Sequence, residues 1–551
     1  MKAPWEGRWV VLVVLAACGA AAAAGWNNSA TNDEPYFTLG AYYAIHGEGL
    51  LVVEHPPLYK LAAGIPLLIL PLPPPREEPL QVLAHLPEEI QRFLHHNTVG
   101  PLAILRAARL GALLFLPVLL WGVWRLGELV GGAKVGWFSV LALACQPLVL
   151  GHAFVVHTDV PAAACWVWAA VFAERLVAGR KGSWLGLGLW LGLALAAKHS
   201  GLLLAALVLL RLLGARLQGR RVPWWPLTGV ALLSAGVPLV LTAWSLRQVS
   251  AVEVQELVVL LAGERLATWS WVGRFLGPLA GCCQSCGHWL LGLLFVLWNN
   301  AYGQGVNFFF GQLSPYGFPL YFPVALIIKL SLPFTLLWWL ALGRWRALPA
   351  PGRWLTAYST LYLLASLGSA FNIGARHLMP VVAWLAALAG CALARLGERW
   401  RALFLAGLAA SPAVSFPHYI AHFSLLVGGA RGGAAILNDS NLDWGQDWAR
   451  VAARARRQGW HPLFAVYLGA DDPAGYGVPV ENVLHTGRLP LRGYVAVSSW
   501  AATVGPDYLE RFLHLPQNAH FLRQVLRQLR GCQLVEQVGH SIRVYRCGES
   551  P

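Results

Sequence analysis

Long apolar segments recur along most of this chain. Runs of roughly 20 residues, rich in Leu, Ala, Val, Gly and Trp, alternate with short polar turns. A helix of about that length crosses the hydrocarbon core of a bilayer. Hydropathy windows therefore predict eleven spanning helices. They lie near residues 9–25, 101–124, 135–151, 160–178, 184–198, 200–217, 224–246, 320–343, 354–371, 377–394 and 402–426.

Two long stretches between these helices do not fit a span. Residues 26–100 form a first outer loop, in which the short apolar segment 61–72 is expected to lie in the membrane interface. Residues 247–319 form a second outer loop, and we interpret its short apolar run, 288–298, as a re-entrant or interfacial helix. The transmembrane part is accordingly assigned to residues 1–429.

The last stretch, residues 430–551, turns mixed and polar and predicts one small extracytoplasmic α/β domain. Cys532 and Cys547 flank its final apolar alternation and could pair in an oxidising exterior, which the sequence leaves open. The elements expected before and within that alternation are a helix at 447–458, strands at 463–468 and 494–498, a helix at 510–529 and a closing hairpin.

Composition supports the membrane assignment. The chain of 551 residues is 57% hydrophobic and only 12% charged, whereas soluble domains are about a quarter charged. A soluble globular enzyme, a disordered chain, a nucleic-acid-binding module and a disulfide-rich secreted scaffold are therefore excluded. The fold class predicted is an all-α polytopic membrane protein with a small C-terminal α/β domain.

The formal net charge of +15 reflects the topology of the chain in the membrane. Lys and Arg favour the cytoplasmic ends of spanning helices. With the N-terminus inside, the inner segments hold seventeen Lys and Arg residues against four acidic ones. The sequence thus predicts an integral protein of the inner or plasma membrane, with a cytoplasmic N-terminus, an extracytoplasmic C-terminal domain and contact with anionic lipid, and no nucleic-acid partner.

Some readings stay open. The first helix has the character of a cleaved signal peptide, although we favour a retained helix. For Cys282, Cys283 and Cys286, a disulfide or plain packing is favoured over a zinc site with His288. No tandem repeat or pair of broken helices marks a secondary transporter, which weakens that reading.

Ionisable residues beside hydrocarbon are costly and mark candidate functional sites. Here most of them fall in the outer half of the membrane under the predicted topology. Acidic and basic groups facing each other at that surface suit a phosphate-bearing lipid substrate with a general base nearby. The candidates are Asp33, Glu34, Glu54, His55, Arg106, Arg109, His157, Asp159, Lys198, His199, Lys329, Arg376 and His377.

Each candidate also has a purely structural interpretation. Asp33 and Glu34 precede Pro35 and are suited to capping a helix, and Asp159 has the same option. The two Arg residues of the second span suit snorkelling or pairing with Asp159. Lys198 and Lys329 suit interfacial anchoring, and a helix-start cap is the plain interpretation of Arg376 with His377. For Asp443 and Asp447, capping is favoured over binding of sugar or metal.

The order of these motifs resembles the protein O-mannosyltransferase family within the C-type glycosyltransferase superfamily. Asp33-Glu34, followed by Glu54-His55-Pro56-Pro57-Leu58-Tyr59-Lys60, is similar to that family's first extracytoplasmic loop. Further matches are Arg109 in the second span, Asp159-Val160-Pro161, Lys198-His199-Ser200, Gly311-Gln312-Leu313-Ser314 with the helix bearing Lys329, and Arg376-His377-Leu378-Met379-Pro380. The resemblance covers about residues 30–430, and residues 441–447 resemble an appended outer domain of bacterial relatives.

The resemblance implies a C-type glycosyltransferase fold. It also implies transfer of a hexose or pentose, such as mannose, from a polyprenyl-phosphate carrier to an extracytoplasmic hydroxyl, with inversion. Asp33 is expected to be the general base, and Glu34 and Glu54 to orient donor and acceptor. Positive charge must stabilise the leaving lipid phosphate, for which we expect Arg109, Lys198 and Arg376, with Arg106, His55 and Lys329 in reserve.

Several points stay open at this stage. Glu34 and Glu54 would alternatively hold a divalent cation, so metal dependence is unresolved, and Glu54 stands where eukaryotic members usually have Asp. The acceptor is a protein, lipid or glycan hydroxyl. The alternative function is a carrier or flippase for the same lipid, which needs the basic cluster and not Asp33.

Overall fold

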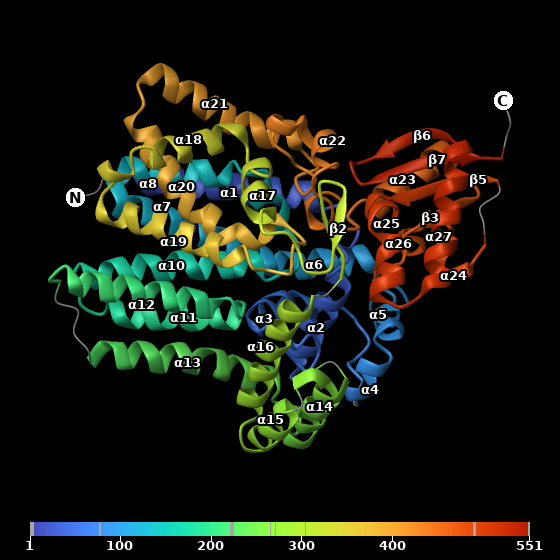
Figure 1. The fold of residues 1–551 in the computed structure, drawn as a ribbon, viewed down its shortest axis with the longest axis horizontal. Coiled ribbons are helices and arrows are strands. Elements are labelled where there is room, and N and C mark those ends of the chain that lie inside the picture. Colours follow the sequence, from blue (N-terminus) through green and yellow to red (C-terminus); the bar gives the residue numbers. More distant parts are fainter. Residues whose placement is uncertain are drawn as a thin grey trace.

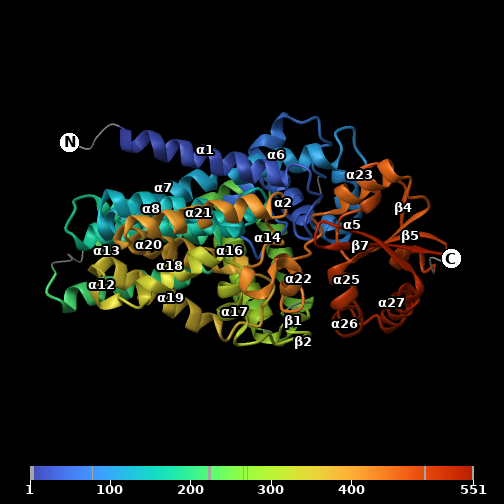
Figure 2. The ribbon, with the colours of Figure 1, turned by 90° about the horizontal axis from the view of Figure 1, so that it is seen from above.

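The computed structural model describes residues 5–76, 79–220, 225–264, 266–269, 271–303, 305–488 and 492–548. They form a bundle of long helices with a β-sheet region at one end (Figure 1). Seen from above, the N-terminal end of the chain and the sheet region lie at opposite ends of the long axis (Figure 2). Lys2 and Arg221, two of the basic residues assigned to the cytoplasm, lie outside the described residues.

Every predicted span contains at least one observed helix of the bundle. Apolar residues favour these helices, and Gly or Pro stands near many of their ends. Pro238 and Pro412 also lie inside the helices at 225–245 and 398–415. The helices are α1 (Trp5–Gly25), α6 (Pro101–Leu113), α7 (Phe115–Gly131), α8 (Ala133–Ala144), α9 (Pro147–Ala153), α10 (Asp159–Val177), α11 (Ser183–Ala197), α12 (Gly201–Leu217), α13 (Trp225–Ser245), α17 (Tyr321–Ile328), α18 (Leu332–Leu342), α19 (Ala350–Ser366), α20 (Met379–Arg395) and α21 (Glu398–Ser415).

The chain is an integral membrane protein whose helices are mostly apolar. Within the described part of the chain, five helical segments are long and apolar enough to cross a membrane, or up to seven if two bent pairs each count as one span. Several other bundle helices are shorter, as α11 is with 15 residues. The total of eleven spans therefore stays a prediction.

Two predicted spans are bent rather than straight. The chain bends by 67° between α8 and α9, and by 116° between α17 and α18. Pro147 and Pro333 lie in the first turns of α9 and α18. Proline begins a helix readily but disfavours helical conformation in the residue before it. The predictions of continuous helices at 135–151 and 320–343 are therefore wrong.

The two predicted outer loops fold into short helices at the sheet end of the bundle (Figure 1). In the first loop, Ile65 and Ile69 are 58% and 83% exposed on the short segment expected in the interface. The elements are α2 (Glu34–His46), α3 (Leu58–Gly64), η1 (Ile65–Ile69), α4 (Pro79–Ala84) and α5 (Leu86–Leu94), then α14 (Ala251–Glu264), η2 (Ala267–Trp269), α15 (Trp271–Cys282), α16 (Gln284–Tyr302), β1 (Asn307–Phe309) and β2 (Gln312–Ser314).

In the second loop, Cys283 and Cys286 form a disulfide, and Cys282 is a free, exposed thiol. The helix α16 takes in the short apolar run that we interpreted as interfacial or re-entrant. It is not among the described helices that are long and apolar enough to cross a membrane. Its interfacial placement remains a prediction.

The sheet region follows the bundle and holds a five-stranded mixed sheet in the order β4-β3-β5-β7-β6. Strand β3 is parallel to β4 and β5, and β7 is antiparallel to β5 and β6. The helix expected first, both strands and the closing hairpin are confirmed, and Cys532 and Cys547 form a disulfide. The elements are α23 (Trp448–Gln458), β3 (Leu463–Val466), β4 (Val480–Asn482), β5 (Gly493–Ser498), α25 (Ser499–Thr503), α27 (Pro516–Gln528), β6 (Gln533–Val538) and β7 (Ile542–Cys547).

One expectation for this region is wrong. Residues 510–529 do not form a single helix, because a π-helical turn, Tyr508–Phe512, ends before α27 begins at Pro516. Proline again explains the break, since its ring fixes the backbone for the first turn of a new helix.

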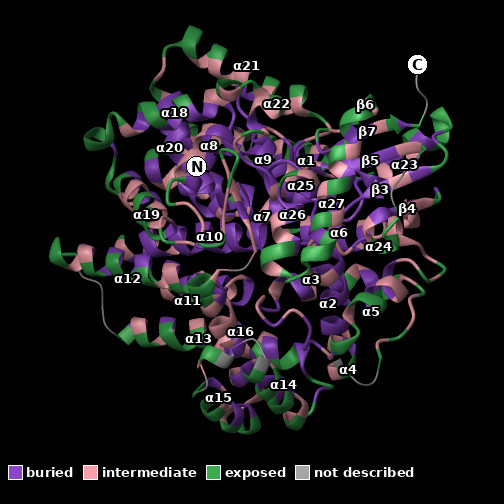
Figure 3. Cartoon of the chain, turned by 45° about the vertical axis from the view of Figure 1, so that its right-hand side comes forward, coloured by how far each residue is buried: buried purple, intermediate pink, exposed green. Residues whose placement is uncertain are grey.

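The buried core of the bundle is centred on α10 and α20 (Figure 3). In the apolar windows of these two helices, 78% and 89% of the residues are buried, against 17% in α13 at the periphery. The segments that lead into α10 and α20 are therefore fixed by the best-packed part of the molecule. Both segments carry candidate site residues.

Candidate active site

A cavity of about 850 Å³ opens where the bundle meets the helices of the two outer loops. Eight of the candidate site residues line it. One part of its wall is polar, and another is formed by apolar side chains of α4, α14 and α16, among them Leu83, Leu257 and Phe295. The candidate residues in the wall are Asp33, Glu54, His55, His157, Lys198, His199, Arg376 and His377.

The polar part is built from the ends of helices. Asp33 directly precedes α2, and Asp159 is the first residue of α10. Lys198 follows the last residue of α11, whereas Arg376 and His377 lie in a short 3-10 turn, Ala375–Leu378, before α20. Four segments that are far apart in the sequence thus place their charged groups together.

Asp159 is the centre of this cluster. Its side chain is 3% exposed and accepts a hydrogen bond from Lys198 Nζ at 2.7 Å. His157 Nδ1 lies 2.7 Å from its other carboxylate oxygen, and Arg376 Nη1 lies 3.5 Å from that same atom. Lys198 Nζ also lies 3.1 Å from His377 Nδ1. One buried carboxylate therefore orients three groups of the cavity wall.

Asp33 is the accessible carboxylate of the cluster. Its side chain is 34% exposed, and Oδ2 accepts a hydrogen bond from Arg376 Nη2 at 3.1 Å. Burial raises the pKa of Asp33, but the hydrogen bond with His157 and the positive charge of Arg376 outweigh this and lower the pKa from its ordinary value. Asp33 is therefore ionised at neutral pH, and its carboxylate lines the cavity. Although it stands before α2, its side chain makes no capping hydrogen bond, so the capping interpretation is wrong.

Glu34 points away from this cavity, although it is adjacent to Asp33. Its side chain is fully buried and forms two hydrogen bonds with the guanidinium of Arg109, at 2.8 and 2.6 Å. The same carboxylate accepts hydrogen bonds from the backbone N–H groups of Thr31 and Val156. Arg109 donates further hydrogen bonds to the carbonyl oxygens of Gly25, Asn28 and Ser29. The interpretation of Arg109 as a partner of Asp159 is wrong.

Arg106 and Lys329 also lie outside the cavity wall. Arg106 donates to the carbonyl oxygen of Trp26 and contacts the ring of that residue. Lys329 is fully buried at the bend between α17 and α18 and donates to three backbone carbonyl oxygens, at 2.5 to 2.9 Å. Neither group is placed to contact a ligand in the cavity, and Lys329 is not an interfacial anchor.

The three candidate carboxylates of the first outer loop, Asp33, Glu34 and Glu54, do not form a common metal site. Asp33 is bound by Arg376, and both oxygens of Glu34 are bound by Arg109 and backbone N–H groups. Within the described ranges, no group of three or more His, Cys, Asp or Glu side chains is arranged to hold a metal ion. The donor set expected for a divalent cation, Glu34 with Glu54, therefore does not fit.

Several features of the site were not predicted from the sequence. The apolar wall is formed by α4 of the first outer loop and by α14 and α16 of the second, and the ordinary apolar composition of these segments gives no signal for a binding surface. The ring of Trp444 lies 4.4 Å from the guanidinium of Arg376, and Ser440 Oγ accepts from Arg376 Nε at 3.1 Å. Nearby, Asp439 has a left-handed backbone with φ of 58°, and burial raises its pKa to about 7. The polar sequence around Trp444 was the one available sign.

Comparison with known proteins agrees with this architecture. Residues 104–243 match the family model described as dolichyl-phosphate-mannose-protein mannosyltransferase. ArnT from Cupriavidus metallidurans in the apo state is 15% identical, with 99% of each chain covered and a TM-score of 0.50. The chain shares the fold of ArnT. The family model confirms the resemblance to the protein O-mannosyltransferases over residues 104–243, which hold Arg109, Asp159 and Lys198.

Two further solved structures are similar at lower scores. ArnT bound to undecaprenyl phosphate is 15% identical, with 98% of this chain and 99% of that chain covered and a TM-score of 0.49. The archaeal oligosaccharyltransferase AglB from Archaeoglobus fulgidus, in complex with an inhibitory peptide and a dolichol-phosphate, is 13% identical, with 94% of this chain and 72% of that chain covered and a TM-score of 0.49. No curated protein matches this chain.

Proposed function

We propose that this chain is a membrane glycosyltransferase that moves a sugar from a polyprenyl-phosphate carrier to a hydroxyl outside the cytoplasm. The observation that carries the proposal is the cavity, which joins an ionised carboxylate, two cationic groups and an apolar wall. These are the groups needed by an amphipathic phosphate-bearing donor and an acceptor that must lose a proton. The matched family is named for a reaction of this class.

The donor is expected to lie along the whole cavity. The apolar wall around Leu83, Leu257 and Phe295 suits the polyprenyl chain, because such chains have no polar group to satisfy. The phosphate would lie beside Lys198 and Arg376, with His55 and His377 nearby. Fixed positive charge at that point stabilises the phosphate as it leaves with both electrons of the glycosidic bond.

Asp33 is assigned as the general base. The acceptor oxygen attacks the anomeric carbon from the face opposite the phosphate, its proton passes to an Asp33 oxygen, and the bond to the lipid phosphate breaks. This displacement inverts the configuration at the anomeric carbon. General-base catalysis by a positioned carboxylate contributes about 10²- to 10⁴-fold in rate. Glu54, in the same wall, is assigned to orienting donor and acceptor.

The remaining predicted residues receive supporting roles. Arg109 and Glu34 fix the turn that carries Asp33, and Asp159 orients Lys198, His157 and Arg376. Lys329 fixes the bend that follows the second outer loop. Glu34, Arg109, Asp159 and Lys329 are not assigned to direct contact with the lipid phosphate, because none of their side chains lines the cavity.

The sugar and the acceptor are left as classes: a hexose or pentose, transferred to a protein, lipid or glycan hydroxyl. We place the site at the outer face of the inner or plasma membrane, with the N-terminus in the cytoplasm and residues 430–551 outside. The basic turns of the bundle support this orientation.

A donor panel tests the proposal. Purified protein in lipid vesicles is incubated with radiolabelled polyprenyl-phosphate sugars and host membrane extract. Transfer of label to a new product by the wild type supports the proposal and identifies donor and acceptor class together. Translocation of the donor between leaflets without any glycosyl product would instead establish a carrier or flippase and overturn it.

A further inference from the structure

Residues 438–447 form a junction segment between the bundle and the sheet region. They are almost wholly buried, although most of them are polar: Asn438, Ser440, Asn441, Asp443, Gln446 and Asp447 are each at most 3% exposed. Buried polar groups are costly unless they are hydrogen-bonded. Each of these polar groups therefore needs a hydrogen-bond partner inside the protein.

One set of contacts reaches Arg376. Ser440 Oγ accepts a hydrogen bond from Arg376 Nε, and the guanidinium lies over the ring of Trp444. The backbone N–H of Ala375 donates to Asn441 Oδ1 at 2.9 Å. The ring of Trp444 also lies 5.5 Å from that of His157. The junction segment thus fixes the cation that faces Asp33.

A second set reaches the turn that carries Asp33. Asn32 N donates to the carbonyl oxygen of Trp444 at 2.7 Å, and Ser29 N donates to that of Gln446 at 3.1 Å. Gly445 has φ of 92°, and a Cβ there would lie 3.0 Å from Asn32 Oδ1. Only glycine fits this close approach without strain.

The sheet region adds two tyrosines to this turn. Tyr467 donates from its hydroxyl to Asn32 Oδ1 at 2.9 Å, and the Tyr476 hydroxyl accepts from Ala30 N at 2.9 Å. The junction segment is itself anchored to the sheet, because Asp443 Oδ2 accepts from Ser498 Oγ at the end of β5 and from Trp500 N. The turn is therefore held between the sheet region on one side and Arg109 on the other.

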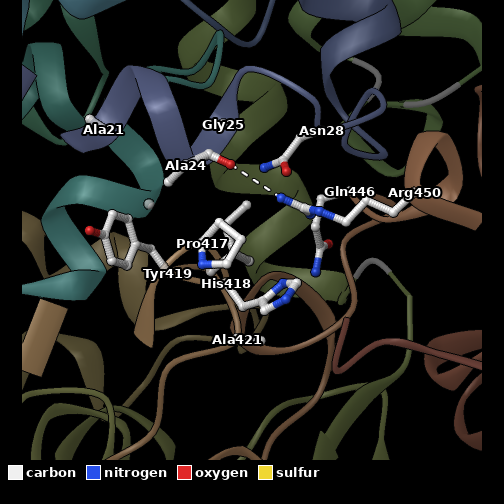
Figure 4. Close-up of a pocket in the computed structure, with 12 residues that line it drawn as sticks. Ala21, Ala24, Gly25, Asn28, Pro417, His418, Tyr419, Ala421, Gln446 and Arg450 are labelled. Carbon is white, nitrogen blue, oxygen red and sulfur yellow. Dashed lines mark hydrogen bonds between the residues drawn. The ribbon is translucent and has the colours of Figure 1, made fainter. Parts of the chain in front are cut away.

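A second, small cavity lies along this junction (Figure 4). Its volume of about 10 Å³ has room for roughly one water molecule, and Asn28 and Gln446 line it. Arg450 of α23 donates across the junction to the carbonyl oxygen of Ala24, at the end of α1, at 3.2 Å. At this point the bundle and the sheet region therefore leave room between them for about one water molecule.

We infer that the sheet region is part of the catalytic machinery: the junction segment, with Tyr467 and Tyr476, positions Asp33 and Arg376 for sugar transfer. Ser440, Trp444, Tyr467 and Tyr476 are positioning residues that act through these two groups. The kinetic part of this inference rests on the proposed function, whereas the structural part does not.

Hydrogen exchange tests the structural part without any turnover. In the full-length Tyr467→Phe/Tyr476→Phe variant, the amides of Ala30 and Asn32 should exchange at least about tenfold faster than in the wild type, because local opening controls exchange. Trp460→Phe is the matched control: Trp460 is a buried aromatic of the same region that stacks on Tyr494. Wild-type exchange in the double variant would overturn the inference, whether or not the chain proves to be a transferase.

Kinetics test the catalytic part once a donor is known. The tyrosine double variant should lose about 10- to 100-fold in kcat, because displacement of a catalytic group by about 1 Å costs that much, while the donor KM stays within threefold. Ser440→Ala and Trp444→Phe, which loosen Arg376, should move the acid limb of the pH profile to higher pH, a change that mere instability does not produce. Unchanged kcat and an unchanged profile in folded variants would overturn the inference.

Discussion

At the residue scale, the sequence supplied the reacting groups but not their partners. Asp33, Lys198 and Arg376 follow from motifs, and all three line the cavity. The ion pair of Asp33 with Arg376 joins positions 343 apart, and no local pattern reports such a contact. Glu34 shows the difficulty most clearly, because adjacent side chains at a helix start point in different directions. One of the two carboxylates enters the cavity and the other enters a buried ion pair with Arg109.

Arg376→Gln should change the pH dependence of transfer. The charge of Arg376 lowers the pKa of Asp33, and the base must be ionised to accept a proton. Removing that charge raises the pKa, so the acid limb of kcat/KM should move to higher pH by about one unit. A pH profile from pH 4 to 8 measures this. A limb at the wild-type position would show that another group is the base.

Glu34→Gln should destabilise the fold. Removing one partner of a buried ion pair leaves an uncompensated charge and costs about 3 to 5 kcal/mol. Unfolding in detergent, followed by circular dichroism, measures the loss. Glu510→Gln, the same chemical change at an exposed ion pair with Arg523 in the sheet region, should keep wild-type stability. Equal stability of the two variants would contradict the buried structural role of Glu34.

At the element scale, apolar runs predicted where helices form and failed where they bend. The segments 135–151 and 320–343 are mostly apolar, yet a new helix begins within each, with Pro147 or Pro333 in its first turn. In the sheet region, alternation located the strands and the closing hairpin, because half-buried strands leave a period of two. The order of the strands could not be predicted from the sequence, because β3 pairs both with β4, the next strand along the chain, and with β5, the strand after that.

Loss of the Cys532–Cys547 disulfide should weaken the sheet region. A bond that closes a loop of about 15 residues contributes about 3 kcal/mol, and these cysteines are 15 residues apart. Cys532→Ser/Cys547→Ser should therefore unfold at lower denaturant concentration. Cys282→Ser, at a free and exposed thiol, is the control and should match the wild type. A double variant as stable as the control would show that the disulfide does not stabilise the sheet region.

At the scale of the whole molecule, the sequence predicted a membrane bundle followed by a small α/β part, and both are present. It did not predict that residues 438–447 join them, because that depends on contacts between distant segments. Because the junction segment joins them, the sheet region and the cavity must lie on the same side of the membrane.

Orientation is tested by protease cleavage sites inserted after residue 180, in the turn before α11, and after residue 531, before β6. The second site should be cut from outside in intact spheroplasts, and the first only after lysis. Accessibility of the first site from outside would reverse the predicted topology.

The central claim is that Asp33 is the base of a sugar transferase, and the Asp33→Asn variant tests it most directly. Transfer is measured with a saturating polyprenyl-phosphate sugar, alongside donor binding, with Glu510→Gln in the exposed part of the sheet region as control. We expect kcat to fall by about 10³-fold with donor Kd within threefold of wild type. Turnover by Asp33→Asn at the rate of the control would contradict the account.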